Sequence, residues 1–338
     1  MAKWLVTGSA GFIGSNFVRY KLAQDPDLNI VIFDKLTYAG NLDNLKDLDE
    51  SRFTFVKADV ADPEAMRAAM EGCEAVVHFA AESHVDRSIM ESSDFIATNV
   101  RGVHNIVEAA RELKTERVLL VSTDEVYGSI KTGSFTEDNR LGPRNPYSAS
   151  KASGDLIGLA HFETYRTPVI ITRGSNTYGP YQYPEKVLPL FVTNAIDDEP
   201  LPLYGDGSNV REWMYVDDHC SGIDTALTKG EPGQVYNVSS GIERKNVELT
   251  HRILELTGKG EDLIRPVEDR LGHDWRYSID SSKLMRLGWE PKIGFDEGTE
   301  RAVRWYQNNE WWWRKIKSGE FRAYYEKQYG ERLSATKK

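Results

Sequence analysis

Three glycines near the N-terminus constrain the fold of this chain more than any other feature. They are spaced as Gly8-x-x-Gly11-x-x-Gly14 and follow directly on the apolar run Trp4–Thr7. Glycines at this spacing permit a tight turn after a strand, close approach of a pyrophosphate to the backbone and close packing of the next helix. The N–H groups at the start of that helix then face the phosphates. The pattern therefore predicts a strand, a dinucleotide-binding turn and a helix.

An acidic residue in the next apolar run supports this interpretation. Asp34 lies 20 residues beyond Gly14 and ends the run Ile30–Asp34. A carboxylate there can accept hydrogen bonds from the adenosine ribose hydroxyls and would repel a 2′-phosphate, so NAD is favoured over NADP. Asp59 and Val60 follow the third run, where they could meet the adenine or simply cap a strand.

Short apolar runs alternate with helical patterns through the first half of the chain. The runs are apolar nearly throughout, as expected for parallel strands covered on both faces. Between them, apolar residues at steps of three and four from Val100 to Leu113 form one helical stripe. This alternation predicts an α/β fold with a Rossmann-type, doubly wound parallel sheet. The candidate strands are Trp4–Thr7, Ile30–Asp34, Phe53–Lys57, Ala75–Phe79, Val118–Ser122 and Val169–Arg173.

The regular alternation stops after about Thr177, where prolines and glycines crowd the sequence. We expect a dinucleotide-binding domain over residues 1–178 with a return segment near 211–240. A smaller, mixed substrate domain is expected over 179–210 and 241–330, covering the C-terminal ends of the strands, where α/β folds place ligands.

Composition excludes several classes of protein. The 338 residues carry 42 Lys and Arg against 52 Asp and Glu, and the net charge of -10 disfavours a nucleic-acid partner. No stretch approaches the roughly 18 apolar residues of a membrane span, and the N-terminus does not resemble a secretory signal. The two cysteines, Cys73 and Cys220, lie far apart. We therefore expect a cytoplasmic protein without structural disulfides or a membrane partner.

A tyrosine and a lysine are placed for acid–base chemistry. Tyr147 and Lys151 stand at i and i+4, on one face of a predicted helix. A phenol with a pKa near 10 is a poor base, but a neighbouring positive charge favours the phenolate and makes proton abstraction from an alcohol feasible. Such pairs also occur by chance on solvated helix faces, so the pair gains meaning only beside the glycine turn.

The glycine turn, Asp34 and the Tyr147/Lys151 pair together resemble the extended short-chain dehydrogenase/reductase superfamily over nearly the whole chain. This resemblance implies bound NAD and a C-terminal domain that binds nucleotide sugars. It also implies these cofactor-binding positions: Gly8, Gly11, Phe12, Ile13, Gly14, Asp34, Lys35, Thr37, Asp59, Val60, Ala80, Ala81, Ser83, Thr98, Tyr147 and Lys151.

Asp124 and Glu125 help to distinguish between the enzyme activities found in that superfamily. Two adjacent carboxyl groups are costly if both enter a closed pocket as anions. They could be solvated acids at a loop entrance, or one could stay protonated and donate while the other accepts. A 4-epimerase needs no second acid–base pair, whereas a 4,6-dehydratase does, because water must leave across two carbons.

Five segments resemble the dTDP-glucose 4,6-dehydratases closely and in order. They are Ala80–Ser88, Thr123–Gly128, Asn176–Gln182, Arg211–Trp213 and Asp269–Asp274. The resemblance implies a lyase that converts dTDP-glucose to dTDP-4-keto-6-deoxyglucose. Tyr147, assisted by Lys151 and Thr123, would take the O4 proton, Glu125 the C5 proton, and Asp124 would protonate the departing C6 hydroxyl.

The same resemblance implies a set of substrate contacts and a homodimer. The dimer would use the helices near residues 95–112 and 147–165, although their apolar stripes fit intramolecular packing equally well. An arginine in the substrate set could instead form a surface ion pair. The implied substrate-binding residues are Ser83, Thr123, Asn176, Lys186, Tyr204, Arg211, Asn246, Arg270 and His273.

Other prominent residues fit structural roles. His161 and His219 lack partners at ligand spacing in the sequence, so we expect no metal. The run Trp311–Trp313 fits core or interface packing better than a stacking platform for bases.

Two alternatives remain open from the sequence. One is another nucleotide-sugar enzyme of the superfamily, either a dehydratase of a UDP-linked sugar or a 4-epimerase. The other is a regulator that keeps the fold without catalysis. Such a regulator would be expected to lack part of the tyrosine, lysine and acid set, yet all of it is present.

Overall fold

The predicted doubly wound sheet is confirmed in the computed structural model, which describes residues 2–269, 274–318, 320–330, 332 and 333. Seven strands lie in the order β10-β6-β5-β4-β1-β2-β3, and every neighbouring pair is parallel. The order reverses between β1 and β4, and the crevice at such a switch point is where open α/β sheets bind ligands. The strands are β1 Lys3–Thr7, β2 Asn29–Asp34, β3 Phe53–Lys57, β4 Ala75–His78, β5 Arg117–Thr123, β6 Val169–Gly174 and β10 Val235–Val238.

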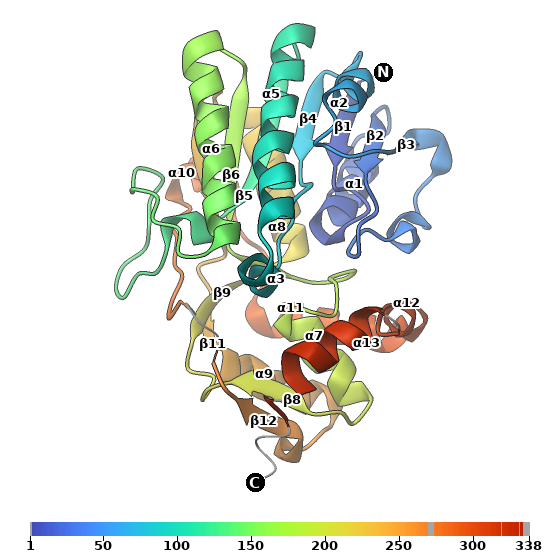
Figure 1. The fold of residues 1–338 in the computed structure, drawn as a ribbon, viewed down its shortest axis with the longest axis vertical. Coiled ribbons are helices and arrows are strands. Elements are labelled where there is room, and N and C mark those ends of the chain that lie inside the picture. Colours follow the sequence, from blue (N-terminus) through green and yellow to red (C-terminus); the bar gives the residue numbers. More distant parts are fainter. Residues whose placement is uncertain (1, 270–273, 319, 331, 334–338) are drawn as a thin grey trace.

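Helices cover both faces of this sheet (Figure 1). On one face α2 packs on α5 and α5 on α6, and on the other α1 packs on α8. Alternate residues of each strand serve the two faces, as the pleat requires: Leu5 belongs to the apolar cluster under α2 and α5, and Val6 to the cluster under α1 and α8. The helices on these faces are α1 Phe12–Gln24, α2 Pro63–Met70, α5 Gly102–Leu113, α6 Pro146–Tyr165 and α8 Val216–Lys229. Two short helices, α3 Val85–Met90 and α4 Ser93–Ile96, lie between β4 and α5 in the chain and pack on α6.

The remaining elements gather below the sheet in Figure 1. They form a three-stranded sheet in the order β11-β9-β7 and a two-stranded sheet of β12 and β8. The chain enters this part after β6, returns to the main sheet through α8 and β10, and leaves again. Its elements are β7 Asn176–Tyr178, α7 Val187–Ile196, β8 Leu201–Tyr204, β9 Val210–Tyr215, β11 Glu243–Lys245, α9 Asn246–Thr257, β12 Ile264–Val267, α11 Phe295–Asn308, α12 Glu310–Ile316 and α13 Glu320–Tyr325. The short helix α10 Ser282–Met285 instead packs on β10 and α8, beside the main sheet.

Short 3₁₀ and π turns complete the chain. The 3₁₀ turns are η1 Leu42–Leu45, η2 Glu50–Arg52, η4 Asp124–Tyr127 and η5 Glu261–Leu263, and the π turns are η3 Ala97–Arg101 and η6 Glu326–Gly330.

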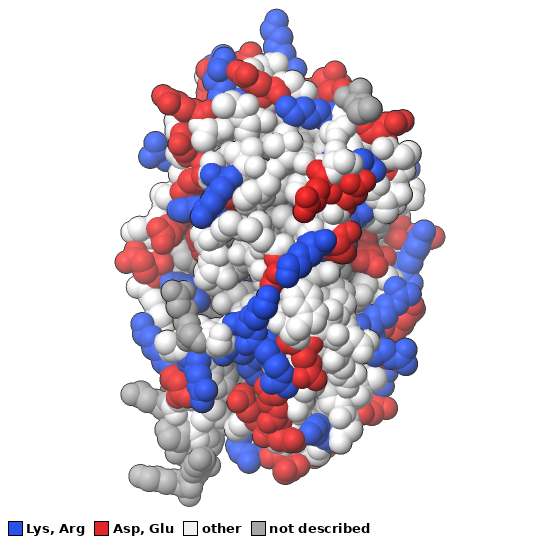
Figure 2. Space-filling model, turned by 90° about the vertical axis from the view of Figure 1, so that its right-hand side faces the viewer, with Lys and Arg blue, Asp and Glu red and all other residues white. Residues whose placement is uncertain are grey.

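Packing of the tryptophan run follows the prediction in two of three positions. Trp312 and Trp313 are buried in the larger apolar cluster, while Trp311 is about half exposed. Both cysteines are free thiols in buried positions. Among the described residues, no helix is long and apolar enough to cross a membrane. Figure 2 shows Lys and Arg interspersed with Asp and Glu over one face of the molecule.

Candidate active site

A cavity of about 340 Å³ lies at the carboxyl ends of the main-sheet strands, where the glycine turn meets the segments that follow β4, β5 and β6. Gly8 has a φ of +68°, a left-handed conformation that favours glycine. A Cβ atom on Gly8 would stand 2.5 Å from the backbone nitrogen of Ala80, and one on Gly14 would stand 2.3 Å from the Gly8 carbonyl oxygen. No side chain caps the start of α1 at Gly11. The turn thus forms a backbone cradle whose N–H groups suit a phosphate.

Asp34 is fixed at the next strand end by two backbone donors. Its Oδ2 accepts from the Ala10 N–H at 2.9 Å, and its Oδ1 accepts from the Leu36 N–H at 2.8 Å. Burial raises the pKa of Asp34, and these two hydrogen bonds partly offset the rise. Nearby, the Lys35 ammonium pairs with Asp59 at 2.6 Å. The carboxylate predicted to bind the ribose therefore lies in the cavity wall, as NAD binding requires.

The start of α6 is fixed by a capping box. Asn145 Oδ1 accepts from the Ser148 N–H at 2.8 Å, Ser148 Oγ accepts from the Asn145 N–H at 3.3 Å, and Pro146 occupies the first turn. This cap sets the rotation of the helix, so that Tyr147 and Lys151 both line the cavity.

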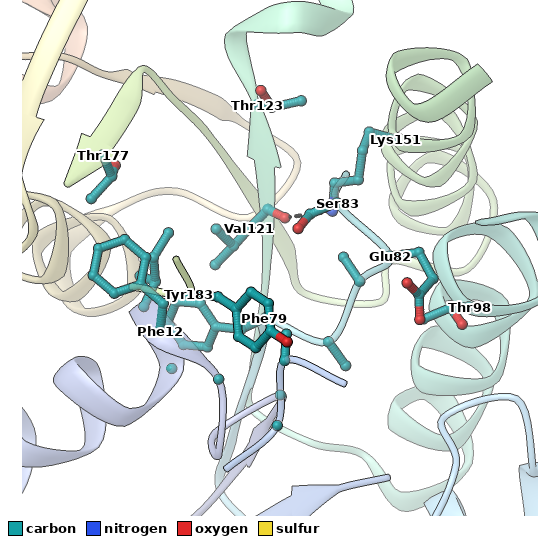
Figure 3. A pocket seen from close by; sticks show the side chains of 18 of the residues that line it. Phe12, Phe79, Glu82, Ser83, Thr98, Val121, Thr123, Lys151, Thr177 and Tyr183 are labelled. Atoms are coloured by element: carbon teal, nitrogen blue, oxygen red, sulfur yellow. Dashed lines mark hydrogen bonds between the residues drawn. The ribbon is translucent and has the colours of Figure 1, made fainter. Parts of the chain in front are cut away.

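Lys151 is hydrogen-bonded to the backbone of the main sheet. Its ammonium donates to the Val121 carbonyl oxygen at 2.7 Å, as the dashed line in Figure 3 shows. Burial lowers the pKa of Lys151 to about 8. Burial raises the pKa of Tyr147 above its usual value, with Glu125 adding to the rise and a hydrogen bond with Thr123 opposing it. The lysine is thus directed to the backbone of β5, because that carbonyl is the acceptor within reach.

The two adjacent acids differ in environment. Asp124 is 3% exposed, and burial, together with the charges of Glu125 and Glu212, raises its pKa well above the usual value. Asp124 Oδ1 accepts from Thr123 Oγ1 at 3.1 Å, while Oδ2 is buried without a hydrogen-bond partner among the described residues. Glu125 Oε2 accepts from Asn145 Nδ2 at 3.4 Å. The pair therefore offers a neutral donor beside a second, hydrogen-bonded carboxyl group.

All sixteen predicted cofactor-binding residues line this one cavity, and the catalytic candidates Thr123, Asp124 and Glu125 line it as well. Figure 3 shows how Phe12, Phe79 and Tyr183 border the space opposite Lys151. Of the substrate candidates, Ser83, Asn176 and Lys186 also line it, and the Lys186 ammonium donates to the Ser83 carbonyl oxygen at 3.1 Å.

Three substrate candidates do not line this cavity. The Tyr204 hydroxyl accepts from Gln328 Nε2 at 3.0 Å, and the Asn246 N–H donates to the Asn209 carbonyl oxygen at 3.0 Å.

Arg211, the third of these, is 5% exposed. Its guanidinium lies 4.5 Å from the ring centroid of Tyr277 and donates to the Asp274 carbonyl oxygen at 2.9 Å. Arg270 and His273 lie outside the described residues.

Several residues that line the cavity are not among the predicted site residues. His219 lines the cavity from α8, shares a 2.8 Å hydrogen bond with Thr177 Oγ1, and has its pKa lowered to about 4 by burial. Glu185 is also buried there and accepts from the Tyr38 hydroxyl at 3.0 Å. No local signal marks these residues, although Glu185 adjoins the predicted Lys186. Other missed lining residues are Phe33, Ala39, Gly40, Ala58, Phe79, Glu82, Val121, Ser122, Gly174, Ser175, Thr177, Gln182 and Tyr183.

The fold brings to His161 two partners that are distant from it in the sequence. Potential ligand atoms of His161, His104 and Glu108 all lie within 4.8 Å of one another. These partners lie on α5, which packs beside α6. They are more than 50 residues away from His161 in the sequence, so the spacing of residues does not indicate the contact.

Comparison with known proteins identifies the family. Residues 5–302 match the family model described as GDP-mannose 4,6 dehydratase. The chain is 51% identical to the low-salt glycan biosynthesis protein Agl12 of Haloferax volcanii, over 89% of this chain and 97% of that protein. It is 48% identical to a dTDP-glucose 4,6-dehydratase of Streptomyces antibioticus, over 93% and 95% of the two chains.

A solved structure agrees in fold and sequence. The dTDP-glucose 4,6-dehydratase DesIV of Streptomyces venezuelae, with NAD and TYD bound, superposes with a TM-score of 0.91. The two chains are 50% identical over 93% of this chain and 100% of that one. The chain therefore belongs to the GDP-mannose 4,6 dehydratase family and, by its relatives, to the dTDP-glucose 4,6-dehydratases.

Proposed function

We propose that this protein dehydrates dTDP-glucose to dTDP-4-keto-6-deoxyglucose with NAD as its cofactor. The observation that carries the proposal is the buried Asp124 carboxyl group beside Glu125, in the same cavity as Tyr147, Lys151 and the glycine cradle. An elimination next to a dinucleotide site needs a general acid and a general base, and a neutral carboxyl group beside a second carboxyl group can supply them.

The residues fit the cofactor. The cradle of Gly8, Gly11 and Gly14 leaves no room for side chains and suits the pyrophosphate, and Asp34 suits the adenosine ribose. Bound NAD would supply the hydride acceptor for C4 of the sugar and the hydride donor for C6, and its positive charge would favour the phenolate form of Tyr147 that proton abstraction needs.

Three side chains would move protons during the reaction. Tyr147 accepts the O4 proton, with Thr123 hydrogen-bonded to it and Lys151 one helical turn away. The resulting C4 ketone acidifies the C5 proton, which Glu125 removes. Asp124, kept neutral by burial, protonates the C6 hydroxyl as it leaves. C5 is reprotonated at the end, so no net oxidation occurs.

The acid pair also discriminates against the alternative activities. Asp124 Oδ2 is buried without a hydrogen-bond partner among the described residues, and burying such a group is costly. The chemistry of a 4-epimerase would not use this carboxyl group, so it would not explain that cost. A UDP-linked substrate lacks the thymine methyl group, whose contact is worth about 1 kcal/mol, and carries an additional ribose 2′-hydroxyl. We assign dTDP because the relatives of similar sequence carry that name.

We also propose a homodimer, a cytoplasmic location, and a division into NAD-binding and nucleotide-sugar-binding parts at the bounds given above. The dimer is supported by large apolar side chains exposed on α3, α4 and α6: Ile89, Met90, Ile96 and Leu156 are 46%, 52%, 54% and 58% exposed. Solvent-exposed apolar groups on adjoining helices favour association.

The test is product analysis by mass spectrometry and NMR. The purified protein is incubated with dTDP-glucose, and separately with UDP-glucose, with and without added NAD. The proposal predicts loss of one water and a C6 methyl group with dTDP-glucose. An unchanged mass with conversion to the galactose isomer would establish an epimerase instead. No reaction with either sugar, even with NAD, would favour the regulator.

A further inference from the structure

Two neighbouring helices bring a metal-type donor set together outside the cavity. His104 and Glu108 stand at i and i+4 on α5, and His161 faces them from α6. The two helices lie side by side (Figure 1). One potential ligand atom from each of the three residues lies within 4.8 Å of the others. None of the three lines the candidate active site.

Glu108 and His161 each keep one possible ligand atom that no hydrogen bond between described residues occupies. Glu108 Oε2 accepts from the Arg111 guanidinium at 2.8 Å, while Oε1 lies 3.4 Å from His161 Nε2. The hydrogen bond from Arg111 lowers the pKa of Glu108, which keeps it ionised. His161 is 8% exposed, and its Nδ1 is buried without a hydrogen-bond partner among the described residues.

The geometry points to a divalent transition-metal site formed by His104, Glu108 and His161. Two imidazoles and one carboxylate are the donors that Zn²⁺ takes in three-ligand sites, with water in the fourth position. Bonds of about 2.0–2.2 Å separate ligand atoms by roughly 3–4 Å, so a small rotation of the exposed His104 side chain closes the site. The ion would cross-link α5 to α6 and stabilise the folded chain.

Zinc binding to the untagged, full-length protein tests this site. After chelator treatment, the protein is titrated with Zn²⁺ by calorimetry, and thermal unfolding is followed with and without the ion. We expect one ion per chain with a micromolar Kd and a rise in Tm. His104→Ala, a change at an exposed position, should weaken binding at least tenfold and abolish the rise in Tm, and Glu108→Gln should weaken binding as well.

His251→Ala is the matched control. His251 is also exposed on a helix and lies 3.7 Å from a carboxylate, that of Glu261, but it belongs to no group of three possible ligands within the described part of the chain. This variant should bind Zn²⁺ like the wild-type protein. The proposal is overturned if the wild-type protein binds Zn²⁺ only at millimolar concentrations. It is equally overturned if His104→Ala keeps the wild-type affinity, because the ion then sits elsewhere, for example on the acids of the cavity.

Discussion

Thr123 Oγ1 donates a 3.1 Å hydrogen bond to Asp124 Oδ1, while the other oxygen of this carboxyl group is buried without a partner among the described residues. An ionised carboxylate with one unsatisfied oxygen is expensive to bury, so the neutral acid is the stable form. Glu125, the next residue, accepts instead from Asn145. Two carboxyl groups adjacent in sequence are thereby given different chemical tasks.

Asp124→Asn should therefore impair elimination more than oxidation at C4. The amide keeps the shape and can donate a hydrogen bond, but it cannot deliver a proton to the leaving hydroxyl. Loss of a positioned general acid costs about 10²–10⁴-fold in rate. Rapid-quench analysis of a single turnover should show a 4-keto sugar that still has its C6 hydroxyl. If oxidation is lost first, the roles assigned to Asp124 and Tyr147 are reversed.

Tyr147→Phe should lower kcat by about 10²–10⁴-fold, because it removes the group that accepts the O4 proton. NAD binding should persist, since the glycine cradle is untouched. Tyr165→Phe, near the other end of α6 and 55% exposed, is the control and should stay within roughly twofold of the wild-type rate. Steady-state kinetics and cofactor content of both variants check this. Comparable losses in the two variants would refute a specific role for Tyr147.

Gly14→Ala should weaken NAD binding roughly 10- to 100-fold, because a Cβ atom 2.3 Å from the Gly8 carbonyl oxygen must displace the phosphate-binding turn. The same overpacking should cost about 1–3 kcal/mol in the free energy of unfolding. Gly294→Ala is the control, because its added Cβ meets no atom within 4 Å. Cofactor titration measures the NAD affinity and urea unfolding measures the stability. Equal NAD affinity in the two variants would contradict the role of the glycine turn in phosphate binding.

A buried glutamate should make stability depend on pH. Burial raises the pKa of Glu212 from 4.5 to about 7, with hydrogen bonds from Ser239, Ser278 and the Ile279 N–H opposing the rise. Because the folded-state pKa lies above the unfolded value, its contribution to stability is full below about pH 4.5 and is lost as the pH rises through 7. Glu212→Gln should thus change stability little at pH 4.5 but stabilise the protein at pH 8, by on the order of 2–3 kcal/mol.

Urea unfolding of the wild-type protein and Glu212→Gln at both pH values checks this. The difference between the two proteins must grow with pH. A difference that stays constant from pH 4.5 to 8 would show that Glu212 does not titrate in this range.

The parts of the fold that could be predicted are those that local chemistry determines. Six of the seven main-sheet strands are predicted to within a residue or two at each end, because parallel strands buried on both faces are continuous apolar runs, whereas β10 is not among the candidate strands. The glycine turn could be located because the spacing of Gly8, Gly11 and Gly14 reflects close backbone contacts.

What could not be predicted depends on contacts between distant segments. His219 reaches the cavity because the chain returns to the main sheet through α8, and nothing near it in sequence marks this. The Lys151 side chain points to β5 because its ammonium donates a hydrogen bond to the Val121 carbonyl oxygen, and this contact between two elements has no signal in the sequence. Arg211 lies against Tyr277, a partner 66 residues away, and an arginine at a phosphate would look the same in sequence.

The most direct test of the central claim follows the hydrogen at C4 of the sugar. dTDP-glucose deuterated at C4 is converted by the purified protein in ordinary water, without added cofactor, and the product is examined by NMR and mass spectrometry. The proposed reaction predicts loss of one water and deuterium in the new C6 methyl group. Deuterium that remains at C4, with no loss of water, would contradict the dehydratase.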